Sequence, residues 1–165
     1  MKKIYFSILL LLIALNAFAQ GDSVKIFPNV NLKNMNGETI STSTFNNGKE
    51  SILLIFWNST YKIPSIELDV IEENYQNWKS EMDVKVIVIS VDDSRTAARV
   101  SPVVSAKGWS FEFYLDINSD FKRAMNVNSL PHTFIITRVG EIVWQTVGFL
   151  DGEENLIYEK LLNYK

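Results

Sequence analysis

The chain of 165 residues contains no cysteine and only one histidine. Without thiols it can form no disulfide and can carry out no thiol chemistry on its own side chains. The usual tetrahedral zinc site of sulfur and nitrogen ligands also cannot be assembled from one histidine. We therefore expect a domain that burial alone stabilises, with no metal and no other cofactor.

Long apolar runs are also scarce, and the longest lies at the N-terminus, in "MKKIYFSILLLLIALNAFAQ". Two lysines, an apolar run over residues 4–15 and the Ala-Phe-Ala pattern at residues 17–19 are typical of a secretory signal peptide. This predicts a signal peptide over residues 1–19, a mature domain over residues 20–165, and an exported product that is periplasmic or extracellular.

The apolar run is shorter than the roughly 20 residues of a membrane span, so we expect no integral membrane protein after cleavage. An uncleaved N-terminal anchor is the alternative. A lipid anchor is excluded, because it needs a cysteine at the cleavage point.

Positive charge is in the minority, with 16 basic against 19 acidic residues and a net charge of −3. Loss of the two leader lysines would change the net charge to −5. This argues against nucleic acid and against anionic lipid surfaces as partners. The 146 residues that would remain suit one domain with one core.

The middle of the chain shows a strand, a helix and a second strand. Ser51–Trp57 and Val84–Ser90 are continuous apolar runs of the kind found in strands that are buried on both faces. Between them, apolar residues recur at helical spacing from Pro64 to Lys79, and Pro64 suits the first turn of that helix.

Weaker patterns on both sides complete an α/β domain. Asn36-Gly37 suits the two-residue turn of a small N-terminal hairpin. After Val84–Ser90 we expect a helix that starts near the cap candidates Asp92, Asp93 and Ser94, kinks near Pro102 and stops at Gly108. The remaining predicted elements are a strand over residues 111–116, a short helix within 118–127, a hairpin over 132–148 that turns at Val139-Gly140, and a helix over Glu153–Leu162.

Three segments then suggest a family: "VISVDDSR", "NVNSLPHTF" and "VGEIVWQTVG". With the order of elements, they make the mature chain resemble the TlpA-like branch of the thioredoxin superfamily, which are exported thiol-disulfide oxidoreductases (redoxins). The resemblance implies a thioredoxin-like fold, in which helices flank a central mixed β-sheet with a small N-terminal β-hairpin. It also implies a cis peptide bond before Pro131 that faces the active site.

The same resemblance locates the family's pair of cysteines in "LIFWNSTYKIPSIEL". A gapless match puts the pair at Tyr61 and Pro64 and the family's acid at Glu67. One inserted residue would move the pair to Lys62 and Ser65. No thiol is present in either register, so the activity of the family does not transfer.

We therefore expect a redox-inactive domain, a pseudoenzyme that serves as a peptide- or protein-binding module. The resemblance implies a binding surface of Tyr61, Lys62, Leu130, Pro131 and His132, and an extended peptide or envelope protein as partner. One alternative is a thiol-disulfide oxidoreductase by descent only. Another is an unrelated hydrolase-type enzyme that uses the hydroxyls of Ser59 or Tyr61 with lysine, glutamate and histidine.

Two titratable residues of this region have plain interpretations as well. Glu67 near the start of a helix is interpreted as an ordinary helix acid that the dipole favours. His132 is interpreted as a structural or surface histidine, because spacing gives no support for a catalytic triad.

Overall fold

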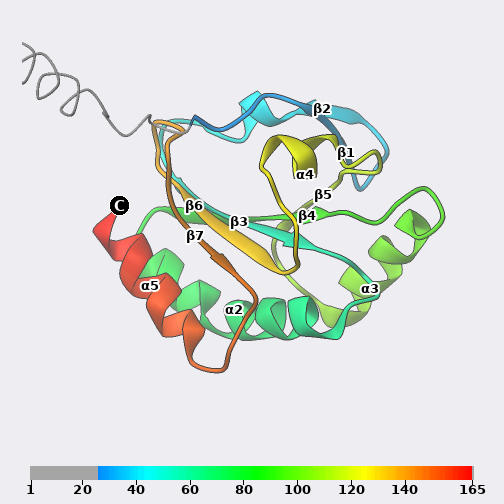
Figure 1. The fold of residues 1–165 in the computed structure, drawn as a ribbon. Coiled ribbons are helices and arrows are strands. Elements are labelled where there is room, and N and C mark those ends of the chain that lie inside the picture. Colours follow the sequence, from blue (N-terminus) through cyan, green and yellow to red (C-terminus); the bar gives the residue numbers. More distant parts are fainter. Residues whose placement is uncertain (1–25, 165) are drawn as a thin grey trace, which may run out of the picture.

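The computed structural model describes residues 26–164, which form one sheet with helices on both faces (Figure 1). The predicted signal peptide and the first residues of the predicted mature domain lie outside this range. The elements are β1 (Asn31–Asn34), β2 (Thr39–Ser41), β3 (Ser51–Trp57), α2 (Lys62–Glu81), β4 (Val84–Ser90), α3 (Val100–Lys107), β5 (Glu112–Leu115), α4 (Asp120–Ala124), β6 (His132–Ile136), β7 (Ile142–Val147) and α5 (Glu153–Asn163).

The sheet has seven strands in the order β2-β1-β5-β4-β3-β6-β7. Strands β3, β4 and β5 run parallel, whereas β6 pairs with β3 in the antiparallel direction and β7 with β6. The hairpin of β1 and β2 joins the sheet through β5. The predicted mixed sheet with a small N-terminal hairpin is confirmed.

Two cores form because successive side chains of a strand point to opposite faces. Leu53, Ile55 and Trp57 of β3 pack toward α2 and α5. Ile52, Leu54 and Phe56 pack toward α4 and the N-terminal hairpin, which lie on the other face in Figure 1. All seven residues of β3 are buried, as its continuous apolar run predicted.

Helix α2 begins two residues before the predicted start, with Tyr61 as its N-cap residue. Pro64 is the third helical residue and lies in the first turn, where a missing N–H leaves no helical hydrogen bond unmade. The side chain of Tyr61 makes no capping hydrogen bond.

Three local predictions are wrong. The N-terminal hairpin turns over three residues, because Asn34 N–H bonds to Glu38 C=O and the Asn34 side chain accepts the N–H groups of Asn36 and Glu38. The helix after β4 starts at Val100 and not near Asp92, Asp93 and Ser94. Pro102 therefore lies in its first turn and causes no kink.

One edge of the sheet collects the segments that matter for function. Trp57 at the end of β3 is level with Ser90 at the end of β4, and Phe56 pairs with His132 at the start of β6. His132 in turn pairs with Val147 at the end of β7. The β3–α2 loop, the loop after β4, the Pro131 loop and the β7–α5 loop therefore meet at this edge.

Candidate functional site

The start of α2 presents apolar side chains to solvent at the position where the resemblance places the cysteines. Tyr61 and Ile63 are each 55% exposed, and Ile66 one turn later is 42% exposed. Lys62 is also exposed, whereas Pro64 is buried. An apolar, solvent-facing surface thus stands where thiol chemistry would have been.

A buried carboxylate fixes the loop that leads to this surface. Asp92 is fully buried and accepts the backbone N–H of Ser59 at 2.8 Å and the Ser59 hydroxyl at 2.7 Å. The hydroxyl of Ser90 donates to the same carboxylate at 2.8 Å. The sequence predicted Asp92 as a candidate helix cap, but the structure shows that it caps no helix within residues 26–164. It instead ties the β3–α2 loop to the end of β4.

The loop before β6 contains a cis peptide bond between Leu130 and Pro131, the conformation that the family resemblance implies. Pro131 C=O accepts the N–H of Gly148, which fixes this loop to the end of β7. The backbone N–H and C=O groups of Asn128, Ser129 and Leu130, in contrast, form no hydrogen bond with any residue of the described range 26–164. Within that range, three consecutive residues just ahead of β6 therefore have main-chain donors and acceptors without a partner.

Glu67 lies beneath this surface and is not the ordinary helix acid that its position suggested. Its side chain is fully buried, and Oε1 accepts the Thr133 hydroxyl at 2.6 Å. Oε2 has no hydrogen-bond partner among the described residues. Burial raises the pKa of Glu67 to about 8, Thr133 opposes this rise, and the nearby Glu153 adds to it. The carboxyl group is thus protonated at neutral pH.

His132 is buried and structural, on the opposite face of the sheet from Glu67. Its ring stacks on Phe134 with centroids 4.2 Å apart, and its Nε2 lies 3.1 Å from Gln145 Oε1. Because a carbonyl oxygen only accepts, Nε2 carries the proton. Burial lowers the pKa of His132, and Nδ1 has no partner in the described part of the chain. Successive residues of a strand point to opposite faces, so Thr133 faces Glu67 while His132 points away from it. The titratable groups of Glu67 and His132 therefore lie on opposite faces of the sheet.

Among residues 26–164, the hydroxyls of Ser59 and Ser65 at this edge have partners other than His132. The Ser59 hydroxyl donates to Asp92, and the Ser65 hydroxyl donates to Tyr61 C=O while it accepts Trp57 Nε1–H. The His132 hydrogen bond goes to Gln145 and to neither serine. Within residues 26–164, no group of three or more histidine, aspartate or glutamate side chains is placed to hold a metal ion, and no helix is long and apolar enough to cross a membrane.

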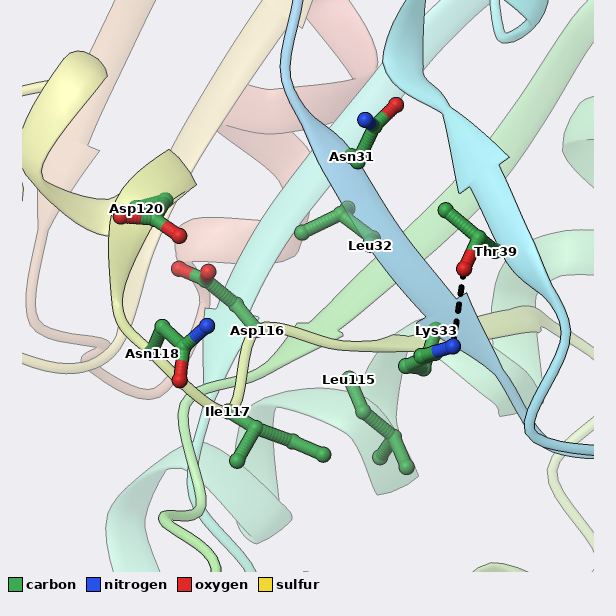
Figure 2. Close-up of a pocket in the computed structure, with 9 residues that line it drawn as sticks. All are labelled: Asn31, Leu32, Lys33, Thr39, Leu115, Asp116, Ile117, Asn118 and Asp120. Atoms are coloured by element: carbon green, nitrogen blue, oxygen red, sulfur yellow. Dashed lines mark hydrogen bonds between the residues drawn. The ribbon is translucent and has the colours of Figure 1, made fainter.

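A cavity of about 330 Å³ lies between β1 and the β5–α4 loop, and no residue of the Pro131 loop lines it (Figure 2). The carboxylates of Asp116 and Asp120 face one another at one end, and Lys33 donates to Thr39 at the other. Asp116 accepts the N–H groups of Phe121 and Lys122 at the start of α4, and burial raises its pKa. These polar groups already have partners, so the cavity offers no prepared binding site.

A mixed sheet with a cis-proline loop beside the start of its long helix defines a thioredoxin-like domain, here without the thiol pair. The chain belongs to the AhpC/TSA family, which matches residues 24–145. The predicted membership in the redoxins of the thioredoxin superfamily is confirmed.

Individual relatives agree with this assignment. The thiol-disulfide oxidoreductase ResA of Bacillus subtilis is 28% identical over 132 residues, which cover 80% of this chain and 70% of that protein. The structure of a thioredoxin-like protein from Porphyromonas gingivalis is 37% identical with a TM-score of 0.74, over 84% of this chain and 90% of the other. The structure of a putative thiol:disulfide interchange protein DsbE from Chlorobium tepidum shares the fold with a TM-score of 0.75 at 18% identity, over 87% and 97% of the two chains.

Sequence reasoning missed two features of this edge. The role of Asp92 was hidden because Ser59, its main partner, is 33 residues away. The exposure of Ile66 and Leu150, which are 42% and 78% exposed, was also missed. The sequence shows only that both residues are apolar. An apolar residue can be buried or exposed, so this signal does not predict their exposure.

Proposed function

We propose that the chain is a redox-inactive docking domain that binds an extended segment of a peptide or an envelope protein at the Pro131 loop. The observation that carries this proposal is the run over Asn128–Leu130 of backbone groups that have no hydrogen-bond partner among residues 26–164. An extended chain that lies beside this run would supply the missing hydrogen bonds, as in strand addition to a sheet. This mode of recognition needs no thiol.

Exposed apolar side chains near the loop support the proposal. Tyr61 and Ile63 lie at the start of α2, and Leu150 lies in the β7–α5 loop. The hydrogen bond from Gly148 to Pro131 holds that loop next to the proline. Apolar groups around a row of main-chain donors and acceptors suit alternate side chains of an extended partner, and an exposed tyrosine is a frequent anchor of interfaces.

We propose in addition that the protein is exported. The signal-like N-terminus predicts export to the periplasm or beyond, and the family's oxidoreductase activity is not carried over because the chain has no cysteine. Export would bring the docking domain to envelope proteins. The hydrolase-type alternative gains no support from the arrangement of Ser59 and His132 described above.

Selection of peptides tests the proposal. Residues 20–165 would be incubated with a library of random nonapeptides that have free carboxyl termini, and bound peptides would be identified by mass spectrometry. Amide hydrogen exchange, followed by NMR, then shows where they bind. We expect binding to slow the exchange of the Ser129 and Leu130 amides, because these groups become hydrogen-bonded.

A matched pair of variants tests the place of binding. Leu130→Lys should weaken the selected peptides about tenfold or more, because an apolar contact is worth about 1.5 kcal/mol or more. Leu156→Lys places the same charge on α5, at a residue that is 41% exposed, and should leave the affinity unchanged. Equal affinity of both variants at unchanged melting temperature would show that peptides bind elsewhere. A failure to select any peptide would refute the function.

A further inference from the structure

A polar cavity of about 380 Å³ lies directly beside the proposed docking segment. The cavity is a different one from that in Figure 2, and it lies between α4 and the residues that follow it. Three of its lining residues, Asn126–Asn128, lead into the Pro131 loop. The full lining is Ser119, Lys122, Arg123, Asn126, Val127 and Asn128.

The cavity is cationic in a chain whose net charge is negative. Lys122 is half-buried, and its Nζ makes no ion pair or hydrogen bond with any residue from 26 to 164. Arg123 pairs with Asp120 and also donates to Asn118 C=O. Arg123 and Asp120 neutralise each other, and the nearby Asp116 accepts the backbone N–H of Lys122 and not its ammonium group. Among residues 26–164, the Lys122 ammonium therefore leaves one positive charge at the cavity without a side-chain partner.

The backbone is unusual at two points of the same lining. Ser119 and Asn126 have φ angles of 57° and 56°, and they are the only non-glycine residues in the described part of the chain with positive φ. Asn126 directly follows the C-cap Met125, where a left-handed asparagine commonly ends a helix, whereas Ser119 precedes α4 as its N-cap, where such a φ is uncommon. Both residues flank the short helix α4, and the two bends bring them to one cavity together with Asn128.

We propose that this cavity binds a carboxylate of the docked partner, so that the preferred ligand is an extended peptide with an acidic group close to the segment held by Leu130. This inference rests on the proposed function, whose ligand class it narrows. A single uncompensated ammonium matches the single charge of a carboxylate. The uncharged side chains of Ser119, Asn126 and Asn128 offer hydrogen-bond donors around it. A phosphate dianion would call for more positive charge or a bidentate arginine, and Arg123 is already paired.

The position of the cavity limits where the acidic group lies in the ligand. A fully extended chain advances about 3.3 Å per residue. Because the loop bends at Ser129 and Leu130, Asn128 and Leu130 are at most about 7 Å apart. The carboxylate should therefore belong to a residue within about two positions of the one that pairs with Leu130. It can come from an aspartate or glutamate side chain or from the C-terminus of the partner.

The selected nonapeptides separate these sources. Each is synthesised in three forms: with a free carboxyl terminus, with an amidated terminus, and with asparagine or glutamine in place of aspartate or glutamate. Affinities are measured for the wild type, for Lys122→Gln, and for the control Lys49→Gln, which removes an exposed lysine ahead of β3. Sodium acetate probes the cavity without a peptide. The NMR shifts of the Asn126 and Asn128 amides are measured in sodium acetate and, as a control, in sodium chloride at equal ionic strength.

We expect Lys122→Gln to weaken the carboxylate form about two- to fivefold, the range for a partly exposed ion pair, and to leave the corresponding neutral form unchanged. The effect should shrink at high salt, and Lys49→Gln should show none of it. Loss of affinity on amidation assigns the site to a C-terminus, whereas loss on side-chain replacement assigns it to an acidic residue.

Equal affinities of charged and neutral peptides, or equal behaviour of Lys122→Gln and Lys49→Gln, would overturn the inference and leave the docking function in place. If no peptide is selected at all, the docking function is refuted. The acetate experiment alone then decides whether the cavity binds a carboxylate. Acetate-dependent shifts that Lys122→Gln abolishes would retain the cavity as a carboxylate site, and their absence would overturn it.

Discussion

Replacing Glu67 by glutamine should remove a large part of the sensitivity of the folded chain to rising pH. Glu67 is fully buried, its Oε2 has no partner among the described residues, and burial raises its pKa from 4.5 to about 8. In the unfolded chain the same group ionises near its ordinary pKa. Between these two values the folded state therefore holds one proton more than the unfolded state.

The sign and size of the effect follow from linkage. Stability from this group is fully present below about pH 4.5, falls as the pH rises, and levels off above about pH 8. One pKa unit corresponds to about 1.4 kcal/mol, so the free energy of unfolding should fall by about 3–4 kcal/mol between pH 5 and pH 8 through Glu67 alone. Glutamine is neutral at every pH and can still accept the Thr133 hydroxyl, so Glu67→Gln should lose this dependence.

Urea unfolding, followed by tryptophan fluorescence at pH 5, 6.5 and 8, measures the difference between wild type and variant. At pH 5 the variant should be equal to the wild type or less stable by about 1–2 kcal/mol, because the new amide N–H groups are buried without a partner. Its relative stability should then rise by about 3–4 kcal/mol toward pH 8. Glu73→Gln, on the exposed face of the same helix, is the control and should show no such trend. Parallel curves for wild type and Glu67→Gln would refute the reasoning.

Three further outcomes are expected. In a disulfide-reduction assay with excess dithiol the mature chain should match the blank, and any rate above a heat-inactivated control would contradict redox inactivity. Tyr61→Cys with Pro64→Cys should give a pair that cycles between dithiol and disulfide, since both lie at the start of α2; if only Lys62→Cys with Ser65→Cys forms a disulfide, the gapless register is wrong. Asp92→Asn should destabilise the domain by about 1–3 kcal/mol and speed amide exchange at Ser59, because an amide nitrogen cannot accept these hydrogen bonds; an unchanged melting temperature would show that Asp92 does not anchor the loop.

The sequence by itself determined the sheet and the lost chemistry. The runs Ser51–Trp57 and Val84–Ser90 became β3 and β4 with their predicted bounds, because a strand that is buried on both faces must be apolar at every position. The absence of cysteine excluded thiol chemistry on the side chains of this sequence without any structural knowledge. These conclusions depend on local composition, which is fully present in the chain itself.

Only the tertiary structure decided how the residues of the candidate site are arranged. Glu67 is neutral because the fold buries it, and its one hydrogen-bond partner in the described range, Thr133, is 66 residues away in the chain. The neighbouring His132 points to the other core, where it stacks on Phe134. The hold of Asp92 on Ser59 likewise depends on a partner 33 residues away in the chain. Burial and pairing arise from contacts between distant segments, and a linear pattern of residue types contains no record of which segments will meet.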